Sequence, residues 1–290
     1  MSKAIKILDF DGTITDEIAE AKPFVEKFLE LYSKESSIPL DDVHLLFDQT
    51  SPFITRYEDT GIDFGGKIVA PAISSQYLFY QVLAQKLYKA SQNGAPYASE
   101  YKNQINLMDN KKIVEIYYPS YKASATVFRE NAQEFLKKHN DAIIVTNSAT
   151  DKVKSKLESI GINDIRLYGN AKKFNIAERI EGIPEKLEEM LDKDISRQIP
   201  RSIYLWRSDY KKVLDEICGK NKNVIVAGDV WEFDNVLPMA LGYQTITLDN
   251  KTESNRIGMT QYERDVVPLL NNSHIANHLE DVDLLLDYYS

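Results

Sequence analysis

Short hydrophobic runs alternate with amphipathic segments along most of the chain. The runs are typical of buried strands, and they occupy residues 5–8, 142–145, 165–168, 203–206, 224–227 and 245–248. Apolar residues at helical spacing predict helices over residues 128–140, 151–160, 210–217 and 233–241, a charged helix over 183–193, and a closing helix over 274–287. Strands that alternate with helices in this way predict an α/β fold built on a doubly wound parallel sheet.

Residues 16–123 lack this alternation. Helical spacing of apolar residues appears around residues 24–32 and 74–90, and a Gly-rich, loop-like segment lies between them at residues 55–72. Ten of the chain's 17 Tyr fall within this region. We therefore expect a mostly α-helical domain, residues 16–123, inserted into a core domain made of residues 1–15 and 124–290.

Composition limits the function. The 290 residues carry a formal net charge of −9, and no basic stripe is present, so we expect no nucleic-acid partner. One Cys excludes a disulfide framework and a thiolate zinc site. No apolar run approaches eighteen residues and no N-terminal signal pattern appears, which predicts a cytoplasmic protein with no membrane partner.

Two carboxylates follow the first apolar run. Asp9 and Asp11 come directly after residues 5–8, and Gly12 then allows a sharp turn of the backbone. Buried like charges are costly unless a cation compensates them, and Mg²⁺ prefers oxygen ligands. The alternative interpretation is an ordinary junction between a strand and a turn, where Asp and Gly are common.

Polar residues also follow two later runs. Thr146 and Asn147 come after residues 142–145, where a hydroxyl and backbone N–H groups can hold a phosphoryl oxygen or simply cap a helix. Asp229 and Asp234 come after residues 224–227. Because Asp9 and Asp229 end two strands of one predicted sheet, we expect the two carboxylates to converge.

These stretches together resemble the haloacid dehalogenase (HAD) superfamily. The segment Asp9-Phe10-Asp11-Gly12-Thr13 is similar to its first motif, Thr146 to the second, and Gly228-Asp229 with Asp234 to the fourth. The resemblance covers residues 1–15 and about 124–250, and it implies a Rossmann-like core. The inserted domain lies between the first and second motifs, where the family carries its helical C1-type cap.

The third motif of the family requires a cation, and its assignment stays open. Arg207 is our first choice, although Arg207-Ser208 replaces the usual Lys-Pro pair. Lys172 is the second choice and Lys173 a distant third. Each of the three can instead be an ordinary surface charge.

The resemblance implies a Mg²⁺-dependent phosphatase acting on a small phosphorylated metabolite. Asp9 would be the nucleophile that forms an aspartyl-phosphate, and Asp11 the general acid and base. Thr146, Asn147 and the third-motif cation would bind the phosphoryl group. The implied metal ligands are Asp9, Asp11 through its backbone carbonyl, Asp229 and Asp234.

Arg56 and Lys67, near the Gly-rich segment of the insert, are candidates for contacts with the rest of the substrate. A solvated surface turn explains these two cations equally well. The Tyr-rich insert also leaves a homodimer possible.

Three other functions remain open. A phosphoryl mutase of the same fold would keep the aspartyl-phosphate and return the phosphoryl group to a second hydroxyl. A dehalogenase fits less well, because that chemistry does not use Asp11 as an acid. An inactive binding or scaffold protein fits poorly, since every catalytic position carries a suitable residue.

Overall fold

The computed structural model describes residues 3–56, 61–176, 178–251 and 257–290. These form two compact units, one of residues 1–16, 63–70 and 128–290 and the other of residues 17–62 and 71–127. We call them the α/β unit and the helical unit. The division differs from the predicted one chiefly at residues 63–70, which were expected in the insert and instead belong to the α/β unit.

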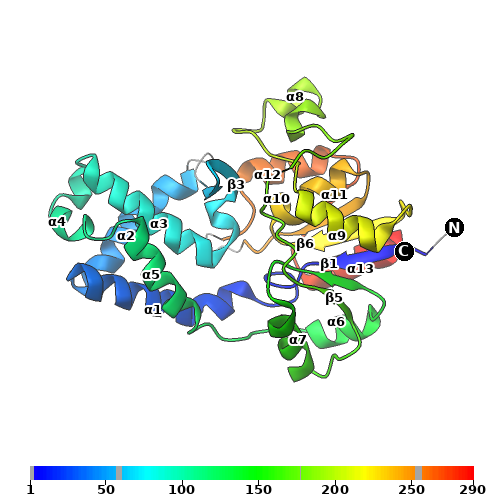
Figure 1. The fold of residues 1–290 in the computed structure, drawn as a ribbon, viewed down its shortest axis with the longest axis horizontal. Helices are drawn as coiled ribbons and strands as arrows, with labels where there is room; N and C mark the ends of the chain where they lie inside the picture. The colour runs from blue at the N-terminus through cyan, green and yellow to red at the C-terminus, as the bar shows by residue number, and fades with distance from the viewer. Residues whose placement is uncertain (1–2, 57–60, 177, 252–256) are drawn as a thin grey trace. The chain divides into compact units, whose positions relative to one another are not determined.

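The α/β unit is built on a six-stranded sheet with the strand order β5-β4-β1-β6-β7-β8, in which every neighbouring pair is parallel (Figure 1). Its strands are β1 (Ile5–Leu8), β4 (Ile143–Val145), β5 (Arg166–Tyr168), β6 (Val224–Gly228), β7 (Gln244–Leu248) and β8 (Ser273–Ala276). The strand order reverses between β1 and β6. A doubly wound sheet places its ligands outside the carboxyl ends of the strands at such a switch point.

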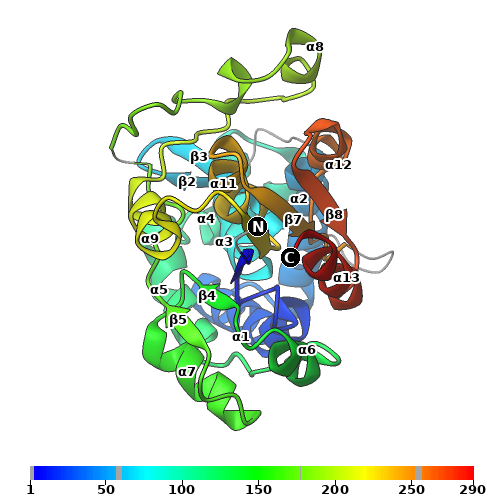
Figure 2. The same cartoon turned by 90° about the vertical axis from the view of Figure 1, so that its right-hand side faces the viewer.

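Helices cover both faces of the sheet, as Figure 2 shows. Residues of α6 (Ala132–Lys138), α7 (Thr150–Ser159) and α13 (Leu279–Tyr289) share one buried cluster with the strands. Residues of α9 (Ser208–Cys218) and α11 (Val236–Ala240) share the cluster on the other face. The predicted α/β fold with a doubly wound parallel sheet and a helical insertion is thus confirmed.

The helical unit is organised around aromatic side chains. Phe24 is buried, and its ring lies 5.0 Å from that of Tyr77 and 5.4 Å from that of Tyr117. The two predicted helices are present as α1 and α3. The elements of this unit are α1 (Glu17–Ser36), α2 (Leu40–Arg56), η1 (Ala72–Ser74), α3 (Gln76–Gln92), η2 (Pro96–Ala98), α4 (Lys102–Ile105) and α5 (Asn110–Tyr121).

Three of the predicted strands and helices differ in the structure. Residues 203–206 form no sheet strand, although Tyr204 makes an isolated bridge to Lys186; Ile203 and Leu205 are buried in a side cluster instead. The predicted closing helix begins only at Leu279, because residues 273–276 add β8 to the edge of the sheet. In place of the predicted charged helix over 183–193, the structure has a short 3-10 helix at residues 187–189 and a four-residue α-helix that begins at residue 193.

These short helices belong to the long connection between β5 and α9, of which the structure describes all residues except 177. It contains η3 (Leu187–Glu189) and α8 (Lys193–Ser196), and α8 lies at the margin of the unit in Figures 1 and 2. The remaining elements of the unit are α10 (Trp231–Asp234), α12 (Gln261–Val266) and η4 (Val267–Leu269). Among the described residues, no helix is long and apolar enough to span a membrane.

Within the Gly-rich segment predicted as a loop, β2 (Gly61–Phe64) and β3 (Lys67–Pro71) form a β-hairpin, whereas residues 57–60 of the segment lie outside the described residues. Lys67 forms an ion pair of 3.1 Å with Glu185 of the long connection and lies 4.5 Å from the ring centre of Tyr204. The Phe64 ring packs 5.1 Å from that of Phe174. These contacts explain why residues 63–70 group with the α/β unit.

Candidate active site

The turn after β1 brings the first carboxylates to the carboxyl edge of the sheet. The backbone N–H of Asp9 donates to Ala227 at 2.8 Å, which continues the pairing of β1 with β6. The backbone N–H of Ile14 then donates to Phe10 at 2.9 Å, which closes one helical turn. Gly12 has φ +80°, and a Cβ atom there would lie 2.0 Å from Asp229 Oδ2. Only glycine fits this turn.

The end of β6 supplies two more buried carboxylates. Asp234 Oδ2 accepts the backbone N–H of Val230 at 3.0 Å, which folds the Asp234 side chain back over the strand end. A Cβ atom at Gly228 would lie 2.3 Å from Asp234 Cβ, so the close approach requires glycine. Asp229 accepts the Asn250 side-chain amide at 3.0 Å and the Thr13 hydroxyl at 3.5 Å.

Lys173 is the cation that joins these strand ends. Its Nζ donates to Asp9 Oδ1 at 2.6 Å and to Asp234 Oδ1 at 2.7 Å, and its side chain is 1% exposed. Burial opposes the charge of Lys173, but Asp234 and Asp9 outweigh burial and raise the pKa of the ammonium. Lys173 therefore stays protonated between the two carboxylates.

The charge of the cluster favours a divalent cation. Asp9, Asp229 and Asp234 are all buried, and each offers an oxygen within 4.8 Å of the others. Burial raises the pKa of Asp9 well above its usual range, Lys173 lowers it, and Asp234 raises it further. Three carboxylates against one ammonium leave a deficit of positive charge. Such a donor set, all oxygen with few carboxylates, suits Mg²⁺.

Asp11 points to a different set of partners. Its Oδ2 accepts the Thr146 hydroxyl at 3.3 Å, and its Oδ1 lies 3.5 Å from the ammonium of Lys156 on α7. The Asp11 side chain is 30% exposed, whereas that of Lys156 is 10% exposed. Asp11 is thus the accessible carboxylate beside the buried cluster, where it can exchange protons.

Comparison with known proteins gives structural likenesses only. No family model and no curated protein matches the chain. The solved structures that match include the HAD-hydrolase YfnB from Bacillus subtilis, described as bound to magnesium; it is 14% identical with a TM-score of 0.45, over 98% of this chain and 100% of that one.

A haloacid dehalogenase-like family hydrolase from Xanthomonas campestris is 11% identical with a TM-score of 0.45, over 99% of this chain and 97% of that one. Both descriptions name the family that the sequence motifs resemble. Because both TM-scores are below 0.5, the interpretation of the site rests on the chain's own residues.

The structure distinguishes the three candidates for the third-motif cation. Lys172 is exposed, and Arg207 is fully buried but donates to backbone carbonyls instead of a carboxylate. Lys173, the last choice from the sequence, contacts Asp9. Lys172 adopts φ +48°, in the left-handed region, and the inward-facing Lys173 that follows is held by Asn147 and Arg207 through its main chain.

The other sequence candidates are placed as follows. Asn147 Oδ1 accepts the backbone N–H of Lys173 at 2.7 Å, so Asn147 supports the cation. Lys67 forms an ion pair with Glu185. Arg56 ends α2, and its side chain lies outside the described part of the structure. The substrate contacts proposed for Arg56 and Lys67 stay predictions.

Three residues near the site were missed by sequence reasoning, namely Lys156, Arg129 and Asn250. Arg129 donates to the backbone carbonyls of Thr13 at 3.0 Å and Gly12 at 2.5 Å, and also bonds to Asn250. Arg129 and Asn250 together hold the turn after β1 beside Asp229. Asn250 lies two residues after the predicted strand 245–248, a position at which a polar residue can indicate a site. No pattern in the sequence marks Lys156 or Arg129.

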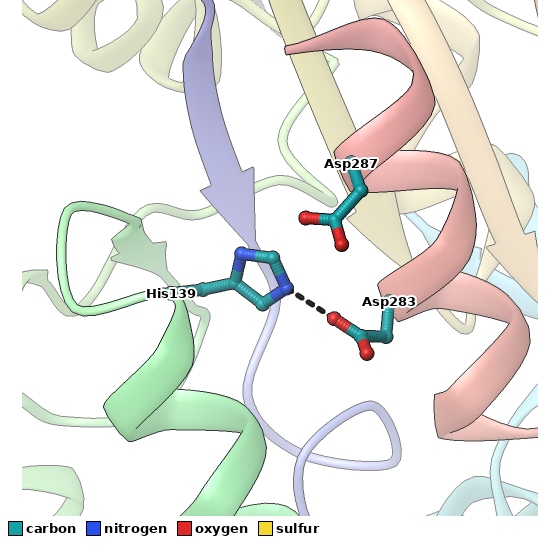
Figure 3. Close-up of side chains that lie close together, drawn as sticks. All are labelled: His139, Asp283 and Asp287. Atoms are coloured by element: carbon teal, nitrogen blue, oxygen red, sulfur yellow. Dashed lines mark hydrogen bonds and ion pairs between the residues drawn. The ribbon is translucent and has the colours of Figure 1, made fainter.

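A second cluster of titratable side chains is formed by His139, which directly follows α6, and by Asp283 and Asp287 of α13 (Figure 3). His139 Nε2 donates to Asp283 Oδ1 at 2.6 Å, because its Nδ1 accepts from the Lys6 ammonium at 3.2 Å. The Lys138 ammonium lies 2.6 Å from Asp283 and 2.7 Å from Asp287, and together with Lys6 it balances the charge of these two carboxylates. These residues therefore attach α13 to α6 rather than form a metal site.

Proposed function

We propose that this chain is a HAD-type phosphatase that hydrolyses a small-molecule phosphate monoester through an aspartyl-phosphate on Asp9, with Mg²⁺ as cofactor. One observation carries the proposal. Asp9, Asp229, Asp234 and Lys173 converge in buried positions at the switch point of the sheet. This arrangement supports a nucleophilic carboxylate paired with a cation site.

The roles of the residues follow from their positions. Asp9 would attack phosphorus and displace the leaving oxygen, to which Asp11 would give a proton. Asp11 would then take a proton from the water that attacks the aspartyl-phosphate, and free phosphate and Asp9 would result. Thr146 lies beside Asp11, where its hydroxyl can hold a phosphoryl oxygen.

Lys173 would reduce the repulsion between the Asp9 carboxylate and the incoming phosphate. Asp9, Asp229 and Asp234 would hold the Mg²⁺, which supplies neutralising charge to the phosphoryl oxygens. The backbone carbonyl of Asp11 is a further ligand implied by the resemblance. The small-metabolite substrate, the cytoplasmic location and a homodimer stay predictions.

The test is hydrolysis of p-nitrophenyl phosphate by the purified chain. We expect activity that is lost in chelator, restored by Mg²⁺, and abolished by Asp9→Asn. Asp194→Asn is a matched control, because the Asp194 side chain is 93% exposed. Acid quenching and borohydride reduction should trap the intermediate on the peptide that contains Asp9.

Two results would contradict the proposal. Activity of Asp9→Asn near that of the wild type would remove Asp9 from the reaction. Full activity in excess chelator would remove the metal. Transfer of the phosphoryl group to a sugar hydroxyl, with little free phosphate, would instead identify a mutase of the same site.

A further inference from the structure

Arg207 is buried in an unusual way. Its side chain is 0% exposed, and no carboxylate in the described residues forms an ion pair with it. Nη1 donates to the backbone carbonyl of Lys173 at 2.7 Å, and Nη2 donates to the backbone carbonyl of Val69 at 2.9 Å. Its Nε has no partner. Burying a guanidinium whose only partners are two backbone carbonyls costs free energy of desolvation. Such an arrangement indicates a specific role for Arg207.

The cost of this arrangement is visible in its electrostatics. Burial lowers the pKa of the Arg207 guanidinium to about 10, against the opposing influence of Glu232 and Asp234. The Phe233 ring lies 5.5 Å from the guanidinium carbon and covers one side of it. Arg207 remains charged at neutral pH, and its planar shape lets it reach two carbonyls at once.

One of these carbonyls belongs to the segment that presents the cation of the site. The segment is strained, because Asn170 and Lys172 have φ of 54° and 48°. It is attached to the end of β4 by backbone bonds from Asn170 to Ser148 at 2.8 Å and from Ala171 to Thr146 at 2.9 Å. Asn147 binds the N–H of Lys173, and Arg207 binds its C=O. The main chain of Lys173 is therefore held on both sides.

The other carbonyl belongs to the hairpin. Val69 lies on β3, and the hairpin is also attached through Lys67 to Glu185. Arg207 thus connects the segment that carries Lys173 with residues 63–70, which are far away in the sequence.

We propose that Arg207 is a positioning residue, which holds Lys173 on Asp9 and Asp234 by binding its backbone carbonyl and ties the hairpin to the same point. The proposal rests on the proposed function for its kinetic consequence only. Its structural part, that Arg207 fixes residues 170–175 and 63–70, can be tested without any substrate.

Hydrogen exchange measured by mass spectrometry tests the structural part. We expect Arg207→Met to speed exchange in peptides covering residues 170–175 and 64–70 by about tenfold, the effect of losing one hydrogen bond. Peptides from β1 and β6 should exchange as in the wild type. Arg197→Met is the control, because Arg197 is 77% exposed. Unchanged exchange in both segments, or a uniform increase across the chain, would overturn the proposal.

A double-mutant cycle tests the kinetic part. We expect Lys173→Met to lower kcat about 10²–10³-fold, and Arg207→Met to lower it about 10–10²-fold. If Arg207 acts through Lys173, the double variant should be no slower than Lys173→Met alone. Losses that multiply would show independent roles and overturn the proposal.

Arg207→Lys keeps the charge and fills the space if the Met variant fails to fold. One ammonium on a flexible stem does not reproduce the fork that spans both carbonyls, so we expect a lower kcat and faster exchange in at least one segment. Wild-type values for both would overturn the proposal. An inactive wild-type protein would refute the proposed function and leave the exchange result to decide the role of Arg207.

Discussion

Replacing Lys173 by Met is the sharpest test of the site. Met has a similar length and no charge, so Lys173→Met removes the ammonium while largely filling its space. The change leaves Asp9 and Asp234 buried without the cation that contacts them at 2.6 and 2.7 Å. Two effects follow, one on stability and one on activity.

The effect on stability depends on metal. Removing one partner of a buried ion pair costs about 3–5 kcal/mol, because the remaining charge is buried alone. For a unit of this size, that corresponds to a fall in Tm of roughly 6–20 °C in chelator. A divalent cation bound to the same carboxylates should restore part of the lost free energy of unfolding. The gain is about 2.7 kcal/mol when the cation concentration is a hundred times its Kd.

The effect on activity should be large even with Mg²⁺ present. Loss of one preorganised charge at the reacting groups costs about 10²–10³-fold in kcat. Lys172→Met is the matched control, since Lys172 is the exposed neighbour and should change kcat less than about threefold. Thermal melting with and without chelator, together with p-nitrophenyl phosphate kinetics, measures both effects.

The reasoning fails if the order of the two neighbours is reversed. A larger loss of activity in Lys172→Met than in Lys173→Met would move the cation role to Lys172. A melting temperature of Lys173→Met in chelator equal to that of the wild type would show that the two ion pairs contribute nothing to the fold.

Three further predictions concern other parts of the α/β unit. Gly12→Ala should abolish activity, because its Cβ meets a carboxylate oxygen at 2.0 Å; Gly182→Ala, at φ +79° with no atom within 4 Å, should cost only backbone strain of about 1–2 kcal/mol in melting experiments. Burial and then Glu232 raise the pKa of Glu263 to about 8, so the folded state binds a proton that the unfolded state has lost between about pH 4.3 and 8. The free energy of unfolding should therefore fall by about 1.4 kcal/mol per pH unit over this range. Glu263→Gln should remove this slope in denaturant titrations. Burial opposes ionisation of Asp283, but Lys138 and His139 outweigh it and lower its pKa; Asp283→Asn should therefore lower Tm above pH 5 without changing kcat, and Asp287→Asn should change Tm less.

The sequence predicted the layers of the α/β unit because five of its six strands coincide with short segments that are mostly hydrophobic or β-branched. It failed at residues 203–206, since an apolar run in a buried loop has the same pattern as a strand. It also missed β8, because only Ile275 and Ala276 of that edge strand are apolar. The positions of Asp9, Asp11, Asp229 and Thr146 were predictable, since each lies within three residues of the end of a hydrophobic run.

The cation of the site was not predictable in the same way. Lys172 and Lys173 are adjacent and identical in type, so pattern and charge treat them alike. The choice depends on a left-handed backbone at Lys172 and on bonds to Asn147 and Arg207, which come from distant parts of the chain. Such long-range contacts leave no trace in local periodicity.

The hairpin affects how this protein can be divided or recombined. Since residues 63–70 belong to the α/β unit, the chain passes between the two units four times, at residues 16/17, 62/63, 70/71 and 127/128. Replacing residues 17–127 by the insert of another protein would remove Val69. The buried Nη2 of Arg207 would then lose its hydrogen-bond acceptor. A chimera made only at junctions 16/17 and 127/128 would therefore lose a buried hydrogen bond of the α/β unit. A chimera that retains residues 63–70 would keep that bond.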